Sequence, residues 1–366
     1  MYTGDFSGQP PAEGGTPPRT RDRDVAVVDL FCGAGGLAYG LSSAGLPVVA
    51  GVDQDPRCRI PITRNSGAAF YQRDVADVTA SELSEWFGDA TIRVLAGCAP
   101  CQPFSTYAQS RKSPDMRWEL LQSFQRLATE VRPEVVTMEN VPGLARRDVW
   151  KDFVRALETS GYNVCWDEVD CVHFGVPQQR KRLVLLASLL GPIAVPSKLG
   201  HHAARTVRDA ISKLPAIKAG GRSAGDPLHV ASRLSRTNLK RVRASRPGGT
   251  WRDWNPELRA ACHLRETGAT YPSVYGRMEW DKPAPTVTTQ FYGFGNGRFG
   301  HPEQNRAISI REAAILQSFP ASYCFVERAE DVNFRGLGIL IGNAVPPKLG
   351  EAIGRTILEH VEIFRR

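Results

Sequence analysis

A cysteine in a proline-flanked segment is the first residue whose surroundings suggest chemistry. The segment Gly97-Cys-Ala-Pro-Cys-Gln-Pro-Phe-Ser105 follows a short apolar run, which predicts a loop at the carboxyl edge of a sheet, where open α/β folds bind ligands. Cys101 would act as a nucleophile there if electropositive surroundings kept its thiol ionised. Cys98 and Cys101 also form a C-x-x-C pair, so zinc binding and dithiol exchange are alternatives. Neither is favoured, because no second pair of zinc ligands has matching spacing and a redox pair normally begins a helix without flanking prolines.

Acidic and basic side chains accompany two other apolar runs. Glu139 ends one run and opens Glu139-Asn-Val-Pro-Gly143; a carboxylic acid beside a sheet-edge thiol can bind a ring nitrogen and share its proton as the thiolate adds. A helix cap or a surface ion pair is the alternative for Glu139. Arg180 and Arg182 precede the other run and share one face of an extended chain. Together they would orient a carboxylate or phosphate and favour a thiolate, although basic residues before a strand often form only a solvated edge.

A glycine-rich loop joins the first apolar run to a helical stretch. In Asp29-Leu-Phe-Cys-Gly-Ala-Gly-Gly-Leu37, glycines allow a tight turn and close approach of the backbone to a ligand. Asp53 ends the next run, where a carboxylate can accept hydrogen bonds from ribose hydroxyls. The spacing departs from the dinucleotide fingerprint, which favours a nucleoside cofactor without a pyrophosphate; a purely structural turn is the alternative. Asp74 is a candidate acceptor for an adenine amino group, or a helix cap.

The periodicity of the chain predicts the elements that position these residues. Short apolar runs alternate with amphipathic stretches as far as Leu190, which predicts an α/β fold, a βαβ series around a largely parallel sheet. Pro, Gly and Arg then become frequent, which predicts a separate, smaller, loop-rich and basic domain. The expected strands are 25–30, 48–52, 93–96, 135–138 and 183–186, and the expected helices are 36–45, 117–131, 148–160 and 347–364.

Composition places the chain among soluble globular proteins. Of its 366 residues 42% are hydrophobic and 23% are charged, and no apolar run approaches the ~18 to 20 residues of a membrane helix. Residues 1–24 are rich in Gly, Pro and charge, which predicts a disordered tail rather than a secretory signal. Eight cysteines without an export signal indicate reduced thiols and a cytoplasmic protein.

The net charge of +8 is concentrated in one segment. Between His201 and Ala260 thirteen Arg and Lys residues stand against four Asp and Glu residues, a distribution that suits a polyanionic partner. A solvated Arg-rich surface is the alternative.

The motifs together resemble the cytosine-5 DNA methyltransferases, in the family's order and across nearly all of the chain from Asp24. The resemblance rests on the glycine loop, the Pro-Cys-Gln segment, the Glu-Asn-Val segment, the Gln-x-Arg-x-Arg segment and two later segments, that is, on 31–36, 100–102, 139–141, 178–182, 282–289 and 342–346. The sequence departs from the family's usual Gly and Pro at Cys98 and Ala99, which we expect to be silent. It also lacks the family's glycine-rich form over 106–117, and this departure weakens the expectation that the catalytic loop makes a closing motion.

The resemblance implies a Rossmann-like methyltransferase sheet and a reaction with S-adenosylmethionine, leaving S-adenosylhomocysteine. Cys101 would add to C6 of a flipped cytosine while Glu139 assists at N3. Arg180 and Arg182 would hold Glu139 or the nucleotide backbone, and Gln178 would support their loop. Phe31 would stack on the adenine, Asp53 would bind the ribose, Asp74 the adenine amino group and Asn343 the cofactor end of the pocket. The remaining expected cofactor-pocket residues are Asp29, Gly33, Gly35, Gly36, Leu37 and Pro100.

The resemblance also implies a division of labour along the chain. Residues 25–192 and 334–366 would form the catalytic domain and residues 193–333 the small target-recognition domain. Trp251 and Trp254 are expected to pack in a core more than to contact DNA. Double-stranded DNA is the expected partner, bound by a monomer in the bacterial cytoplasm near the nucleoid, with a companion restriction endonuclease and no metal or membrane. The expected DNA contacts are Gln102, Ser105, Lys240, Arg241, Arg243 and Arg246.

Three other functions compete with this one. Transfer RNA is the substrate of one branch of the same family, although a basic segment of ordinary size favours DNA. A non-enzymatic nucleic-acid binder is disfavoured because Cys101, Glu139, Arg180 and Arg182 are all present. A nucleotide-dependent dehydrogenase is disfavoured by the glycine spacing and by the Pro-Cys-Gln segment.

Overall fold

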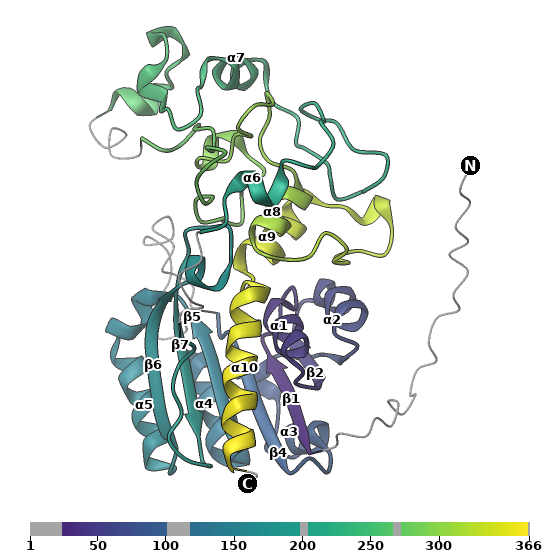
Figure 1. Ribbon diagram of the computed structural model, residues 1–366, viewed down its shortest axis with the longest axis vertical. Coiled ribbons are helices and arrows are strands. Elements are labelled where there is room, and N and C mark those ends of the chain that lie inside the picture. The colour runs from purple at the N-terminus through teal and green to yellow at the C-terminus, as the bar shows by residue number, and fades with distance from the viewer. Residues whose placement is uncertain (1–23, 101–117, 198–203, 266–271, 365–366) are drawn as a thin grey trace.

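The computed structural model describes residues 24–100, 118–197, 204–265 and 272–364. Figure 1 shows a twisted sheet flanked by helices in the lower half of the molecule and short helices with long connections above it. The last helix, α10 (Pro347–Phe364), returns from the upper region and lies along the sheet.

Seven strands form one sheet in the order β3-β2-β1-β4-β5-β7-β6. The first five are parallel, whereas β7 runs antiparallel to both β5 and β6. The central strands are buried along nearly their whole length, as expected for parallel strands covered by helices on both faces. The strands are β1 (Val25–Leu30), β2 (Val48–Asp53), β3 (Ala69–Gln72), β4 (Ile92–Gly97), β5 (Val135–Asn140), β6 (Asn163–Asp170) and β7 (Lys181–Ser188).

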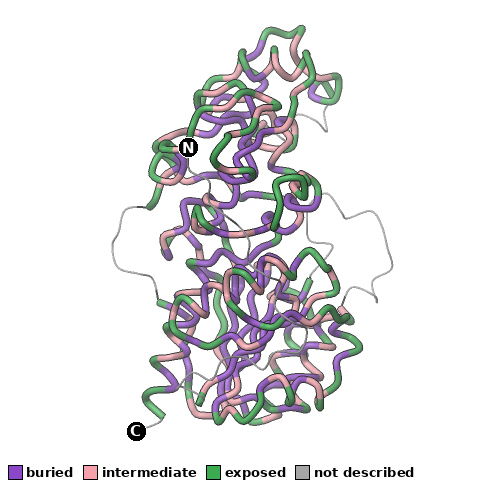
Figure 2. The backbone as a smooth tube through the Cα atoms, turned by 90° about the vertical axis from the view of Figure 1, so that its right-hand side faces the viewer, coloured by how far each residue is buried: buried purple, intermediate pink, exposed green. Residues whose placement is uncertain are grey.

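Helices cover the two faces of the sheet with separate apolar cores. Successive strand residues alternate between them: Val27 and Val94 face the helices α1 and α10, while Val28 and Leu95 face α3, α4 and α5. Figure 2 shows the buried residues concentrated between these layers. These helices and their short neighbours are α1 (Gly36–Ala44), α2 (Arg59–Asn65), α3 (Ala80–Phe87), α4 (Glu119–Val131), α5 (Asp148–Thr159), η1 (Pro56–Cys58), η2 (Val75–Asp77), η4 (Pro142–Arg146) and η5 (Cys171–Phe174).

Glycines let α1 and α10 approach each other unusually closely. A Cβ atom on Gly36 would lie 2.0 Å from the Val345 carbonyl oxygen, and one on Gly40 would lie 2.4 Å from the Pro347 carbonyl oxygen. Side chains are therefore excluded at both positions, and the segment before α10 is held against the glycine loop.

The upper region relies on buried polar contacts more than on regular structure. The Arg277 guanidinium is buried and donates to the carbonyl oxygens of Val242, Ser245, His301 and Gln304, so one side chain ties four loop positions together. The elements here are α6 (Val207–Ile211), α7 (Arg236–Ala244), α8 (Ile310–Leu316), α9 (Phe334–Asn343), η6 (Trp251–Asp253), η7 (Pro256–Leu258), η8 (Ala261–Leu264), η10 (Phe294–Asn296) and η11 (Ala329–Asp331).

The upper region contains parts of two apolar clusters, one continuous with the core of the sheet and one separate from it. The cluster shared by α1 and α10 continues upward through residues such as Met278, Phe291 and Ile308. A smaller separate cluster contains Trp251 and Trp254, both buried, which confirms that these rings pack rather than lie on the surface.

The five expected strands and four expected helices are all present, to within a few residues at their ends. The strands β3 and β6 were not predicted. The sheet is largely parallel, as expected, except that β7 pairs antiparallel with both neighbours. Just before β1, the Asp24 carbonyl accepts a hydrogen bond from Ile92 N at 2.7 Å. Residues 1–23, for which a disordered tail is expected, lie outside the described residues. Within the described segments, no helix combines the length and apolarity needed to cross a bilayer.

Candidate active site

The loop between β1 and α1 has an uncommon backbone. Phe31, Gly33 and Gly35 all adopt left-handed conformations, with φ of 58°, 52° and 72°. Glycine tolerates this region, whereas a phenylalanine there carries strain that the surrounding structure must hold. Gly35 is the N-cap of α1. The loop therefore turns sharply at the end of β1 and presents its backbone to the space above the sheet.

Asp53 braces this loop from the end of β2. One carboxylate oxygen accepts the Gly33 backbone N–H at 3.0 Å and the other accepts the Asp55 backbone N–H at 2.9 Å. Burial raises the pKa of Asp53, and these two backbone hydrogen bonds oppose the rise. Asp53, twenty residues after Gly33, thus makes a direct contact between the second strand and the glycine loop.

Asp29, in the carboxyl-terminal half of β1, is an acidic side chain of the site whose two carboxylate oxygens both lack a well-aligned hydrogen bond within the described structure. The residue is 1% exposed. Burial raises its pKa to about 7; the Ala38 backbone N–H offsets part of the rise and nearby Asp53 adds to it. A buried acceptor whose two oxygens lack a well-aligned donor among the described residues fits a ligand that brings a positive charge or N–H groups to this place.

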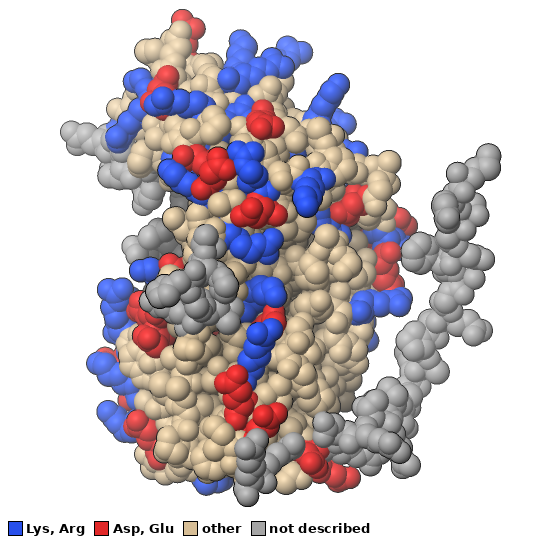
Figure 3. All heavy atoms as spheres, viewed as in Figure 1, with Lys and Arg blue, Asp and Glu red and all other residues tan. Residues whose placement is uncertain are grey.

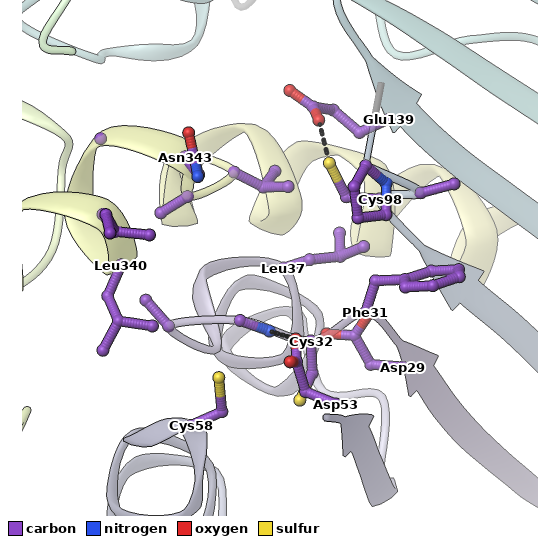
Figure 4. A pocket seen from close by; sticks show the side chains of 18 of the residues that line it. Asp29, Phe31, Cys32, Leu37, Asp53, Cys58, Cys98, Glu139, Leu340 and Asn343 are labelled. Carbon is purple, nitrogen blue, oxygen red and sulfur yellow. Dashed lines mark hydrogen bonds between the residues drawn. The ribbon is translucent and has the colours of Figure 1, made fainter. Parts of the chain in front are cut away.

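A cavity of about 340 Å³ lies in front of these residues, between the strand ends and α9. That size is within the range of small-molecule sites. Figure 4 shows Asp29, Phe31 and Asp53 on one side and Leu340 and Asn343, from α9, on another, with Cys98 and Glu139 at the far end. The predicted residues that line it are Asp29, Phe31, Gly33, Leu37, Asp53, Pro100, Glu139, Arg180, Arg182 and Asn343.

Glu139 ends β5 inside this cavity and has two charged or polar neighbours. It is 2% exposed; Arg182 Nε lies 2.7 Å from Oε1, and the Cys98 thiol donates to Oε2 at 3.0 Å. The next residue, Asn140, donates from Nδ2 to the Ala99 carbonyl at 3.0 Å. The ends of β4 and β5 are therefore joined by side chains immediately before position 101.

Arg180 and Arg182 share the cavity wall but have different partners. Only Arg182 pairs with Glu139; Arg180 donates to the carbonyls of Val287, Gly342 and Ala344, each at 3.1 Å. Arg180 thus contacts the end of α9 and the 282–289 segment rather than Glu139, and its expected contact with the nucleotide stays a prediction. Burial, with the charge of Arg182, lowers the pKa of Arg180 to about 9.

Gln178 extends the same connection. Its side-chain oxygen accepts from Val287 N, and its amide nitrogen donates to the Leu316 carbonyl and to Gln317 Oε1. It lies outside the cavity and joins the sheet to α8 and to the 282–289 segment, in keeping with the supporting role expected for it.

Several other predicted residues lie elsewhere. Asp74 accepts from Ala76 N as the N-cap of η2 and does not line the cavity, so the helix-cap alternative describes its contacts. Gly35 and Gly36 shape the loop and its packing without lining the cavity. Cys101, Gln102 and Ser105 lie outside the described residues.

The four basic candidates on or after α7 differ in exposure. Lys240 and Arg243 are exposed, and Arg246 lies 3.4 Å from Asp253 in an exposed ion pair. Arg241 packs over the Trp254 and Tyr275 rings and donates to the Leu258 carbonyl, so its guanidinium is occupied within the protein. In the face drawn in Figure 3, basic side chains in the upper part are interspersed with acidic ones.

Many residues that line the cavity were not among the predicted site residues; Cys32, Cys58, Cys98 and Leu340 are examples. Cys98 could have been singled out from the sequence, because a cysteine stands there where the family pattern has glycine. Leu340 could not, because α9 was not predicted. Among the described residues no cluster of His, Cys, Asp and Glu is arranged to hold a metal ion.

The family model for C-5 cytosine-specific DNA methylases matches residues 25–359. The chain belongs to this family. The methylase is 47% identical over 341 residues to the type II methylase M.HgiDII of Herpetosiphon aurantiacus, covering 92% of the chain and 96% of that protein. It is 29% identical to the type II methyltransferase M.Sau96I of Staphylococcus aureus, covering 94% of the chain and 78% of that protein.

The fold of the methylase is also found among solved structures. A prophage-encoded E. coli protein described as a DNA modification methyltransferase superposes with a TM-score of 0.68 at 21% identity, covering 92% of the chain and 99% of that protein. The α/β sheet predicted from the sequence is thus that of known methyltransferases, and the chain is a DNA cytosine-5 methyltransferase. The transfer RNA alternative is not favoured.

Proposed function

We propose that the chain methylates carbon 5 of a cytosine flipped out of duplex DNA, with S-adenosylmethionine as donor and Cys101 as nucleophile. The observation that carries this proposal is the Arg182–Glu139 pair, which lies in the same cavity as the glycine loop and as Pro100, the residue that precedes Cys101.

The cavity residues fit the donor. Asp29 offers an unsatisfied carboxyl group for a cationic or N–H-bearing part of the ligand, Asp53 retains acceptor capacity for ribose hydroxyls, and the Phe31 ring lines the cavity for stacking. When bound, the donor supplies an electrophilic methyl group. Leu37 and Asn343 would contact it from α1 and α9.

The protein's part of the reaction is to make C5 nucleophilic. The Cys101 thiolate would form a bond to C6 while Glu139 provides a proton at N3, so that the electrons of the C5–C6 bond become available at C5. After methylation, solvent water takes the C5 proton, the sulfur–C6 bond breaks with its electron pair returning to the Cys101 thiolate, and N3 returns its proton to Glu139, which restores the ring. Arg182 holds the carboxyl group of Glu139 in place throughout.

We also propose that residues 193–333 form the target-recognition region and that the enzyme acts as a monomer on DNA beside a companion endonuclease. The type II bacterial relatives support a place in restriction and modification, and the basic surplus between 201 and 260 supports DNA contact in this region.

Bisulfite sequencing of DNA from bacteria that express the chain will identify the methylated sequence. A duplex with 5-fluorocytosine at that position should then form a denaturation-resistant adduct with the enzyme and S-adenosylmethionine, because C5 carries no proton to lose. The Cys101→Ala variant should bind the duplex without forming an adduct. An adduct that persists in this variant would place the nucleophile elsewhere, and no adduct with the parent enzyme would contradict addition at C6.

A further inference from the structure

The carboxylate of Glu139 has a different kind of partner on each oxygen. Oε1 forms an ion pair with Arg182, whose Nε is 2.7 Å away, and Oε2 accepts the Cys98 thiol at 3.0 Å. Figure 4 shows the Cys98 sulfur directed at the carboxylate from the neighbouring strand end. A guanidinium is a strong, permanently charged donor, whereas a thiol is a weak one. Arg182 therefore holds Oε1 by charge attraction without a well-aligned hydrogen bond, and Oε2 is held by a hydrogen-bond donor that is easily replaced.

Cys98 is itself well fixed. It directly follows β4, its backbone N–H donates to the Leu30 carbonyl at 3.4 Å, and the neighbouring Ala99 carbonyl accepts from Asn140 at 3.0 Å. Two consecutive residues after β4 thus contact two consecutive residues at the end of β5. The contacts of Cys98 with Glu139 and of Ala99 with Asn140 together fix the position of the thiol.

We propose that Cys98 is a positioning residue for Glu139, holding Oε2 toward the cavity in the free enzyme and ceding it to the flipped cytosine. The inference rests on the proposed function and adds a residue to its machinery. The exocyclic amino group of cytosine, which lies next to N3, is a better donor to a carboxyl oxygen than a thiol, so the exchange at Oε2 costs little. The thiol stands where the resemblance led us to expect glycine, and the proposal replaces the expectation that this change is silent.

Variants at position 98 test the proposal through the chemical step. Cys98→Ala removes the donor at nearly constant volume, and we expect the single-turnover rate of methyl transfer to fall about tenfold, with the dissociation constants of DNA and S-adenosylmethionine unchanged within about twofold. Cys98→Ser restores an O–H donor and should return the rate to within about threefold of the parent. Cys165→Ala, on β6 and away from the cavity, is the matched control.

A double-mutant cycle separates positioning from general packing. If Cys98 acts through the Glu139 carboxylate, Cys98→Ala should have no further effect once Glu139→Gln has removed that carboxylate. Rate reductions that multiply in the double variant, or a Cys98→Ala enzyme as fast as the parent, would overturn the proposal. Failure of the parent enzyme itself to trap 5-fluorocytosine DNA would instead contradict the proposed function.

Discussion

The carboxyl group of Asp29 shows how a binding residue can weaken the fold that carries it. A buried carboxyl group that has only the Ala38 backbone N–H beside it resists ionisation, and its pKa is raised to about 7 from the ordinary value of 3.8. Between these values the unfolded chain loses its proton while the folded chain keeps it, so stability falls as pH rises through this range and levels off above it. The ligand that pairs with Asp29 would recover part of this cost.

The Asp29→Asn variant should therefore be more stable than the parent when no cofactor is present. The gain should grow from about pH 4 to about pH 7 and stay constant above, reaching at most on the order of 4 kcal/mol. Urea unfolding at pH 5 and pH 8 measures it, and isothermal titration should show weaker binding of S-adenosylmethionine. Equal stability of the two proteins at pH 8 would mean that Asp29 has a donor in solution.

At the scale of elements, the packing of α1 on α10 positions the cavity wall. Gly36 and Gly40 allow the two helices to touch backbone to backbone, and the segment just before α10 includes Ala344 and Val345, which line the cavity. Separating the helices would therefore displace cofactor contacts that lie a turn or more away from the substitution.

The Gly40→Ala variant tests this packing. Alanine normally favours a helix over glycine by up to about 1 kcal/mol, but here its Cβ would meet Pro347 O at 2.4 Å and Glu351 N at 2.6 Å. We expect a net loss of about 1 to 3 kcal/mol in urea unfolding and weaker cofactor binding. Gly225→Ala, where no atom lies within 4 Å of the added Cβ, should change stability by less than about 0.5 kcal/mol. A Gly40→Ala protein as stable as this control would contradict the packing argument.

The elements that could be predicted from sequence are those with uninterrupted apolar runs or long amphipathic periods. The missed strand β6 is an edge strand whose exposed Trp166, Asp167 and Glu168 break the apolar pattern, and β3 has only four residues. The order of motifs identified the cavity because strand ends meet at one edge of a sheet. The partners of Arg180 could not be predicted, because they belong to α9 and the 282–289 segment, more than a hundred residues away.

At the scale of the whole molecule, Arg180 and Gln178 link the sheet to the upper region. Both side chains are buried. Gln178 donates a hydrogen bond to α8, and Arg180 donates hydrogen bonds to α9 and to the 282–289 segment. A shift of the upper region on binding DNA would therefore act on the side of α9 that lines the cavity. Any such coupling must be reciprocal, with DNA and cofactor raising each other's affinity by the same factor.

Charge on the upper region should govern DNA affinity through exposed residues alone. Replacing Lys240 and Arg243 by alanine should weaken binding of the target duplex and reduce the magnitude of the salt slope by about 0.9 for each phosphate that the protein no longer neutralises. Lys151→Ala on α5, an exposed lysine on the lower half of the molecule, is the control and should leave the slope unchanged. Fluorescence anisotropy over a range of salt concentrations measures both. An unchanged slope in the double variant would mean that other residues bind the phosphates.

The left-handed backbone of Phe31 has a consequence outside catalysis. Together with the buried carboxyl group of Asp29 and the burial of the Arg180 guanidinium, it concentrates unfavourable energy where the methyl donor is expected to bind. A ligand present at a hundred times its dissociation constant adds about 2.7 kcal/mol to the folded state. In a growing cell, donor scarcity would expose more of the enzyme to proteases, so metabolic supply would set the lifetime of each molecule as well as its turnover.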